Sequence, residues 1–368
     1  MHCAKCKGVC MRNVRIALLC SVFIFSVHCA GLSASEKKYK LLKPPEGFQI
    51  SKSGKEIIET RALLPEGNTG IAAKYPGDDG IENDPDVIFV ETFAAGPGQD
   101  LLSPIVKRWD TVKHEKNMKL SNEVPAGSAD KRSLLFERGQ NQGGGGYLYR
   151  KIEPEVEKVF VRYYVKFNEQ CGKISHFGAW IGGYNPPTAW PQGGAGSRPS
   201  GNKRFTTGVE PGGGWGWDFY TYWQGMHKHG DGRYWGTPFL VKGPKPKVDK
   251  GQWICVETMV KLNDPVSASN GEQAFWIDGR LFRRGGQVAS HFGPGFPKGK
   301  WMGGWWSADS SVDKTFDGMQ WRSSKELAIN FLWLQVYKLR APKQGTTSRV
   351  WLDNVVVAKS YIGPMESR

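Results

Sequence analysis

Cysteine is scarce over most of this 368-residue chain. Five of its seven cysteines lie within the first 35 residues, and only Cys171 and Cys255 follow them. So few cysteines exclude a small scaffold that is held together by many disulfides. In an oxidising compartment, Cys171 and Cys255 form either one disulfide or two buried free thiols, and the sequence leaves both alternatives open.

Long hydrophobic runs are also few. The run over residues 16–27 is too short to cross a membrane, because a spanning helix needs about 20 residues. Basic residues precede this run at Arg12 and Arg15, and small residues follow it. The pattern predicts a signal peptide over residues 1–35, with Met11 as an alternative true start. We therefore expect a secreted or periplasmic protein that has no transmembrane segment.

Apolar stripes with the 3.6-residue period of a helix are rare, whereas period-two alternation is frequent and glycine is abundant. The alternating segments are residues 87–93, 133–138, 147–152, 159–167, 174–180, 204–210, 215–223, 253–262, 273–278, 327–337 and 349–358. They predict an all-β fold, a two-sheet antiparallel jelly-roll sandwich over residues 87–368. Residues 36–86 have little periodicity, and we expect them to form a loosely ordered N-terminal extension.

Acidic residues are outnumbered by basic ones. The formal net charge is +15, and the first 35 residues contain four basic residues and no acidic one, so the mature chain keeps +11. A basic exported protein most simply binds an anionic partner, such as an acidic polysaccharide. Nucleic acid is not an expected partner, because export removes the chain from it and no recognised nucleic-acid motif occurs.

One local stretch, "GDDGIENDPD" at residues 77–86, is strongly acidic. Its carboxylates allow a calcium site, because hard cations prefer several oxygen ligands. The spacing differs from that of a calcium-binding helix–loop–helix motif, so a solvated turn is the alternative that we favour. No other cofactor is expected.

Several predicted strands carry polar side chains opposite their apolar face. In "WGWDFYTYWQ" (residues 215–224), alternation places Trp217 and Phe219 in the core. The opposite face carries an acid, two phenols and an amide: Asp218, Tyr220, Tyr222 and Gln224. In the segment 159–167, Arg162 and Tyr164 likewise lie opposite valines. We expect such faces to form an open cleft for an extended polar chain, with tryptophans that stack on sugar rings.

Three parts of the chain resemble polysaccharide lyase families 14 and 20. "CGKISHFGAWIGG" (residues 171–183) is similar to the glycine- and lysine-containing segment of these families, and "WDFYTYWQ" is similar to the strand with their Tyr-x-Tyr pair. Residues 251–281 and 350–364 resemble the closing strands of concanavalin A-like jelly rolls, which include these lyases. The resemblance covers roughly residues 87–364.

The resemblance implies β-elimination of a uronic-acid polymer. This reaction needs a group that neutralises the sugar carboxylate, a base for the C5 proton and an acid for the departing oxygen. By resemblance, the catalytic candidates are Tyr220 and Tyr222 as base and acid in an order left open, Lys173 at the carboxylate, and His176 as an alternative base. The candidates for substrate binding are Arg204, Glu210, Asp218, Gln224 and Trp180.

Two other functions stay open. A glycoside hydrolase on the same fold would use Glu210 and Asp218, because such enzymes need two carboxyl groups about 5–9 Å apart. A non-catalytic carbohydrate-binding protein is the other alternative, because a fold alone does not confer chemistry.

Overall fold

The computed structural model describes residues 48–50, 57–59, 64–94, 103–139, 145–190, 194–212, 214–342 and 346–366. The chain divides into two units, Met1–Leu63 and Leu64–Arg368. The expected signal peptide lies outside the described residues. In the first unit, the described part is one antiparallel pair of strands, β1 (Phe48–Ile50) and β2 (Ile57–Glu59). Within the described ranges, no helix is long and apolar enough to cross a membrane.

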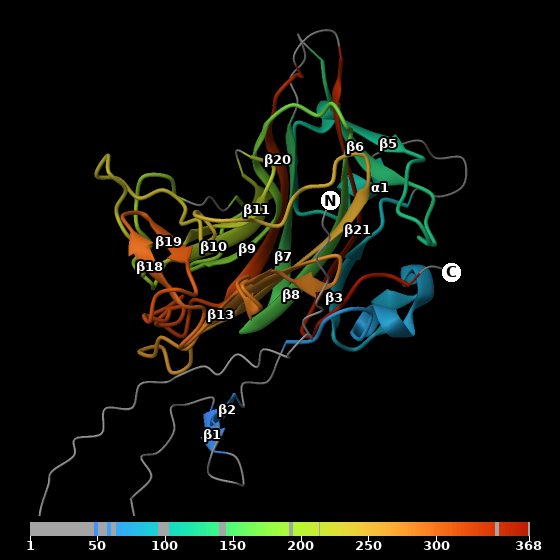
Figure 1. Cartoon of the computed structure of the whole chain (residues 1–368). Helices are drawn as coiled ribbons and strands as arrows, with labels where there is room; N and C mark the ends of the chain where they lie inside the picture. The colour runs from blue at the N-terminus through green and yellow to red at the C-terminus, as the bar shows by residue number, and fades with distance from the viewer. Residues whose placement is uncertain are drawn as a thin grey trace, which may run out of the picture. The chain divides into compact units, whose positions relative to one another are not determined.

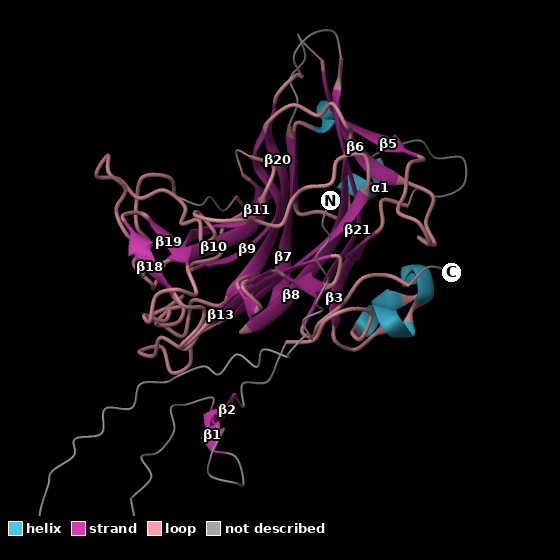
Figure 2. Ribbon diagram, in the orientation of Figure 1, coloured by secondary structure: helices cyan, strands magenta, loops and turns pink. Residues whose placement is uncertain are grey.

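The second unit is built from two antiparallel sheets, which Figure 1 and Figure 2 show. The six-stranded sheet contains, in spatial order, β11 (Trp217–Tyr222), β10 (Arg204–Pro211), β9 (Ile174–Tyr184), β20 (Ile329–Leu339), β7 (Gly146–Val156) and β4 (Thr111–Lys113). The nine-stranded sheet contains β14 (Arg280–Leu281), β13 (Glu272–Ile277), β12 (Trp253–Lys261), β8 (Lys158–Phe167), β21 (Ser348–Ala358), β6 (Ser133–Arg138) and β5 (Met118–Ser121), with β17 (His291–Phe292) beside β13 and β3 (Val87–Glu91) beside β21. The chain crosses repeatedly between the sheets, as from β7 to β8 to β9, in a jelly roll.

The remaining elements are short. Two ribbons pair β15 (Arg283–Arg284) with β16 (Gln287–Val288) and β18 (Gly299–Met302) with β19 (Trp305–Ala308). The helical elements are α1 (Ser103–Val106) and the 3-10 turns η1 (Ile71–Lys74), η2 (Pro76–Asp78), η3 (Ile81–Asn83) and η4 (Glu115–Asn117).

Each of the eleven strands that the sequence predicts is present, so the prediction of an all-β antiparallel sandwich is confirmed. The bounds differ by a few residues, and β9 runs four residues beyond the predicted segment 174–180. In the second unit, the strands that the alternation did not predict are β4, β5 and β14 to β19. Each has only two to four residues, which is too short for a two-residue period to be recognised.

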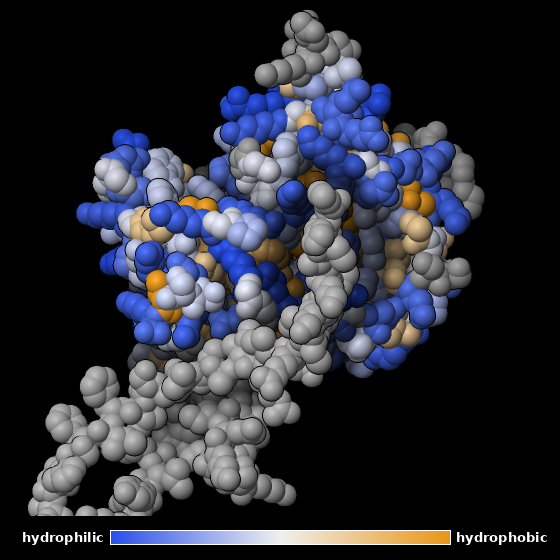
Figure 3. Space-filling model, viewed as in Figure 1, coloured by the Kyte–Doolittle hydropathy of each residue, from blue (hydrophilic) through white to orange (hydrophobic). Residues whose placement is uncertain are grey.

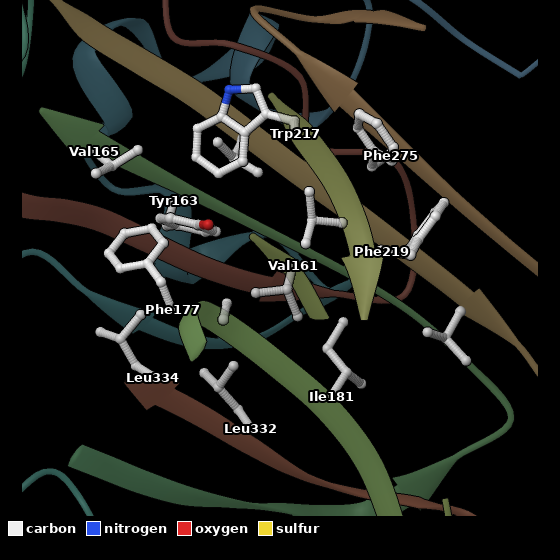
Figure 4. Packing of buried hydrophobic residues seen from close by; sticks show 14 of the residues in the cluster. Val161, Tyr163, Val165, Phe177, Ile181, Trp217, Phe219, Phe275, Leu332 and Leu334 are labelled. Carbon is white, nitrogen blue, oxygen red and sulfur yellow. The ribbon is translucent and has the colours of Figure 1, made fainter. Parts of the chain in front are cut away.

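Alternation along the strands fills the space between the sheets, as Figure 4 shows. Tyr163 from β8 and Phe177 from β9 lie with ring centroids 6.3 Å apart. Phe219 from β11 packs edge-on against Phe275 from β13, at 5.0 Å. Trp217 is fully buried beside them. The apolar faces predicted for β8 and β11 are therefore confirmed.

The other face of the nine-stranded sheet is not the open cleft that Arg162 and Tyr164 led us to expect. Arg162 is fully buried, and its Nη2 donates to Asp78 Oδ2 at 2.6 Å. The Tyr164 hydroxyl accepts a hydrogen bond from the backbone N–H of Met365 at 2.7 Å. Residues 64–86 and the C-terminal segment cover this face. The expectation was wrong because a buried guanidinium needs a partner, and the supposed loose extension supplies it.

The acidic stretch at residues 77–86 is not a solvated turn. Asp78 accepts hydrogen bonds from Arg162 and from Asn354 Nδ2, and Asp84 forms an ion pair with Lys74 Nζ at 2.5 Å. Both aspartates are buried. Across the described residues, no group of three or more potential metal ligands gathers. Asp78 instead attaches this stretch to the sheet, and Asp84 pairs within the N-terminal segment.

Cys171 and Cys255 are both buried free thiols, so the structure selects the second of the two alternatives that the sequence left open. Burial raises the pKa of the Cys171 thiol to about 11. Burial also raises the pKa of Cys255, which lies among charged groups of β8 and β12. Both thiols are therefore protonated and unreactive at neutral pH.

Glu257 on β12 fastens the C-terminal segment to the nine-stranded sheet. Its two carboxylate oxygens accept the backbone N–H groups of Ile362 at 2.8 Å and Gly363 at 2.9 Å. Burial raises the pKa of Glu257 to about 7, whereas a glutamate in an unfolded chain titrates at about 4.3. The native state consequently holds a proton on Glu257 over a range in which the unfolded state has lost it.

We predict that Glu257 makes the protein less stable as the pH rises from about 4.3 to about 7. The stabilising contribution of the protonated carboxyl is complete below the unfolded pKa and disappears as the pH passes the folded one. Relative to Glu257→Gln, the free energy of unfolding of the wild type should fall by roughly 3 kcal/mol over this range. Denaturant unfolding at several pH values measures the difference. A difference that stays constant with pH would contradict the prediction.

Candidate active site

The outer face of the six-stranded sheet carries a row of aromatic side chains. Tyr220 on β11 lies opposite Gly208 on β10, Gly208 lies opposite Trp180 on β9, and Trp180 lies opposite Trp333 on β20. A Cβ atom at Gly208 would lie 2.3 Å from the Trp180 ring, so this ring occupies the space that the glycine leaves. Trp180 is only 3% exposed, and its Nε1 donates to Phe177 O at 3.1 Å. Trp180 is thus the floor of this face.

His176 stands at the edge of this floor. Its φ of 51° is in the left-handed region, which few non-glycine residues adopt. Its ring centroid lies 4.9 Å from that of Tyr220, 5.7 Å from that of Trp180 and 5.6 Å from that of Tyr337. The side chain is partly exposed to solvent. The strained backbone therefore holds an accessible imidazole against the aromatic row.

Glu210 at the end of β10 lies beside this imidazole. Its Oε2 lies 3.5 Å from His176 Nδ1 and accepts a hydrogen bond from the backbone N–H of Phe177 at 3.1 Å. One carboxylate oxygen thus contacts both the histidine ring and the peptide group that follows the left-handed residue. Glu210 is therefore in place to orient His176, as a carboxylate orients the histidine of a catalytic triad.

Tyr220 and Tyr222 lie next to each other, with ring centroids 5.7 Å apart. Burial raises the pKa of both phenols, most strongly that of Tyr220. The interaction between the two phenols raises the pKa of Tyr220 further and lowers that of Tyr222. Tyr222 is almost fully buried, whereas Tyr220 is half-buried. Tyr220 is therefore a protonated phenol that is in contact with His176.

Arg204 at the start of β10 supplies positive charge beside this pair. Its charge lowers the pKa of Tyr222, against the larger opposing effect of burial. The guanidinium is half-buried, and its Nη2 donates to the Ser197 carbonyl at 3.2 Å and to Ser197 Oγ at 2.8 Å. Arg204 thus lies between the tyrosines and the loop that follows β9.

Asp218 faces a different environment, although it lies directly opposite Glu210 in the strand register. It is 4% exposed. Its oxygens accept the backbone N–H groups of Phe239 and Leu240, each at 2.9 Å to Oδ1, and Lys245 Nζ at 2.7 Å to Oδ2. All of these partners belong to the protein, so the carboxylate anchors a loop and is not presented to a ligand.

Two other candidates also lie apart from the His176 cluster. Gln224 Nε2 donates to Arg322 O at 3.5 Å, and its side chain packs against Gly201. Lys173 precedes β9 and is exposed. Within the described ranges, no hydrogen bond or ion pair joins its side chain to the cluster. The candidates that the structure brings together are therefore Trp180, His176, Glu210, Tyr220, Tyr222 and Arg204.

A second group of aromatic residues lies on the same face. The sequence suggested Trp190 as a loop tryptophan that stacks on sugar, but not its neighbours Tyr147, Trp333 and Tyr337. Trp333 and Tyr337 lie on the outer face of β20, and Tyr147 lies on β7 across from Gln335. The signal was present in "FLWLQVYKL", where Trp333, Gln335 and Tyr337 alternate with leucine and valine.

Comparisons with known proteins found likeness only among solved structures. No family model matches the chain, and no curated protein matches it. The alginate lyase Aly36B is 14% identical over 82% of this chain and 100% of its own, with a TM-score of 0.41. The alginate lyase vAL-1 from Chlorella virus is 15% identical over 74% of this chain and 100% of its own, with a TM-score of 0.44. The cellulose induced protein Cip1 is 14% identical over 75% of this chain and 99% of its own, with a TM-score of 0.41.

We predict that Asp218 and Glu210 differ sharply in their contribution to stability. Asp218→Ala should lower the free energy of unfolding by about 2–4 kcal/mol, because it leaves buried backbone N–H groups without acceptors. Glu210→Gln keeps an acceptor for Phe177 and should cost less than about 1 kcal/mol. Denaturant unfolding of the two variants tests this contrast. Equal losses would show that the two carboxylates have the same structural role.

Proposed function

We propose that this protein is an exported polysaccharide lyase, which cleaves a uronic-acid polymer by β-elimination on the outer face of the six-stranded sheet. The observation that carries the proposal is the convergence of His176, Glu210 and Tyr220, with Arg204 near the neighbouring Tyr222. It joins an oriented imidazole, a protonated phenol and a cation on one face that is lined by tryptophan. These are the groups that the reaction needs.

Tyr220 is suited to the role of acid and not to that of base. Burial and the neighbouring Tyr222 hold its pKa far above the ordinary value, so the phenol keeps its proton at neutral pH. When that proton leaves, the buried Tyr222 hydroxyl is the group that hydrogen-bonds the phenolate that forms. In this proposal Tyr220 is the acid, one of the two orders that the sequence left open.

His176 is suited to the role of base. Histidine is the commonest general base in enzymes, and the Glu210 carboxylate oxygen 3.5 Å from Nδ1 favours the tautomer whose lone pair is on Nε2. The role of Glu210 is to hold this tautomer and to stabilise the imidazolium that follows proton transfer. Its negative charge is directed toward His176 and the Phe177 N–H group, not toward the position of a sugar carboxylate.

The reaction then balances without water or a cofactor. His176 takes the proton from C5, the electron pair of the C5–H bond forms the C4–C5 double bond, and the C4–O4 bond breaks. Tyr220 gives its proton to the departing O4, and a proton passes from His176 back to Tyr220 before the next cycle. The charge that develops on the sugar carboxylate needs a cation, and Arg204 is the cation that we assign to it.

The carboxylate pair of the hydrolase alternative is not favoured. Such a pair needs two carboxyl groups that both reach the sugar, whereas Asp218 is buried and its oxygens are occupied by Phe239, Leu240 and Lys245. Glu210 then has no partner acid on the neighbouring strand.

We predict that the purified protein releases ultraviolet-absorbing, unsaturated sugars from alginate or glucuronan. Tyr220→Phe and His176→Ala should each lower the rate 10²- to 10⁴-fold, the usual loss when a general acid or base is removed. Tyr222→Phe should lower it by about tenfold, because it removes one hydrogen bond. The absorbance increase with time is the measurement.

Tyr164→Phe is the matched control, because Tyr164 is also a buried tyrosine with a raised pKa but lies on the other sheet. It should leave the rate unchanged. Reducing ends without ultraviolet absorbance would mean hydrolysis, and binding without either product would mean a non-catalytic protein. Either result would reject the proposal.

A further inference from the structure

Four aromatic rings form a continuous surface next to the His176 cluster, and we call them the aromatic platform: Tyr147, Trp190, Trp333 and Tyr337. The Tyr147 centroid lies 5.6 Å from that of Trp190, 5.8 Å from that of Trp333 and 6.2 Å from that of Tyr337. The Trp190 and Trp333 centroids are 5.4 Å apart. The platform comes from β7, β20 and the segment after β9, and it is separate from the core between the sheets.

The platform is accessible. Tyr337 is 53% exposed and is the most exposed large hydrophobic residue among the described ones. Tyr147, Trp190 and Trp333 are half-buried. In Figure 3, which shows one side of the molecule, hydrophobic residues occur only in small separate patches on the described surface. A cluster of four partly exposed rings on one sheet face suits a binding surface.

An unsatisfied donor lies in the middle of the platform. Gln335 is on β20 between Trp333 and Tyr337 and pairs with Tyr147 of β7 and Gly178 of β9. The residue is 2% exposed, yet its Nε2 has no hydrogen-bond partner in the described structure, and neither has Trp333 Nε1. Buried donors without acceptors are costly and rare in native proteins. A ligand whose oxygen atoms accept hydrogen bonds from Gln335 Nε2 and Trp333 Nε1 explains why these donors have no partner in the protein.

The rim of the platform is cationic. Lys113 at the end of β4 places its Nζ 3.7 Å from the Trp190 ring centroid, in a cation–π contact. Aromatic faces beside hydrogen-bond donors suit the apolar face and hydroxyl groups of a pyranose ring, and an ammonium group at the rim suits a carboxylate on that ring.

We propose that the aromatic platform is a second sugar-binding subsite, which holds an acidic pyranose residue of the polymer beside the bond that is cleaved. This inference rests on the proposed function, because it places the platform in the same substrate groove. Tyr337 connects the two regions, since its ring lies 5.6 Å from that of His176. The His176 cluster and the platform lie on different strands of one sheet, and neighbouring strands are about 4.8 Å apart. A polymer that reaches both therefore runs across the strands, from β11 over β9 to β7.

The subsite predicts a dependence on substrate length. A uronic-acid hexasaccharide reaches across both the His176 cluster and the whole platform, whereas a disaccharide covers only part of this surface. Tyr337→Ala and Trp190→Ala should each weaken hexasaccharide binding about tenfold, the loss expected for one stacked ring. They should weaken disaccharide binding by a smaller factor. Calorimetric titration with mannuronate and glucuronate oligomers, on the wild type and on Tyr220→Phe, measures binding independently of turnover.

Trp351→Ala is the matched control for Trp190→Ala. Trp351 is also half-buried and also has a lysine near its ring, Lys166 at 5.9 Å, but it lies on β21 of the other sheet. It should not change the affinity for either oligomer. Unchanged hexasaccharide binding in both platform variants, or no binding of any oligomer to the wild type, would overturn the inference.

Gln335→Leu separates a ligand-binding role from a structural one. If Nε2 donates to the sugar, this variant weakens hexasaccharide binding several-fold while the protein becomes no less stable, because a buried unpaired donor is removed. Lower stability with unchanged binding would overturn the role of Gln335 in the subsite.

Lys113→Met tests the charge of the sugar. It should weaken binding of the uronate hexasaccharide and not that of a neutral glucan hexasaccharide, and equal effects would overturn the acidic assignment. Failure of the proposed function is a different result: no unsaturated product from any polymer, with the length-dependent binding intact.

Discussion

Each side chain of the six-stranded sheet must point either into the sandwich or away from it, and the arrangement of both core and candidate site depends on this constraint. Trp217 and Phe219 on β11 pack in the core, while Tyr220, the residue after Phe219, faces outward. Because the strands are antiparallel and in fixed register, Tyr220, Gly208, Trp180 and Trp333 form one row across four strands. A shift of one residue in β11 would bury Tyr220 and expose Trp217.

The departure from regular strand geometry at His176 adds what alternation alone does not supply. Its left-handed backbone is followed by a peptide group that donates to Glu210, and the same carboxylate faces the imidazole. Backbone strain of this kind persists only where neighbouring contacts enforce it, and it is often found at functional sites. In our proposal, β9 and β10 together supply the base and the carboxylate that orients it.

Much of the fold was predictable because the long strands have the two-residue period, as β8 and β12 show. The partners of polar residues that look exposed in the sequence were not predictable in this way. Arg162 and Asp218 have the sequence pattern of a cleft, yet Asp78 and Lys245, both distant in sequence, bury them. The candidate site was predictable where residues share a strand face, as for Tyr220 and Tyr222. The platform and the contact between His176 and Glu210 depend on the pairing of β9 with β10 and β20, which one sequence does not specify.

The central claim is that the outer face of the six-stranded sheet removes a proton from a uronate and adds no water to the polymer. Digestion of a uronic-acid polymer in water labelled with heavy oxygen, followed by mass spectrometry of the products, tests it most directly. We expect new chain ends that carry no label, on fragments that are one water lighter than the corresponding hydrolysis products. In His176→Ala these fragments should no longer form. Incorporation of the label into the products would contradict the account, because it would show that water, and not an internal elimination, breaks the glycosidic bond.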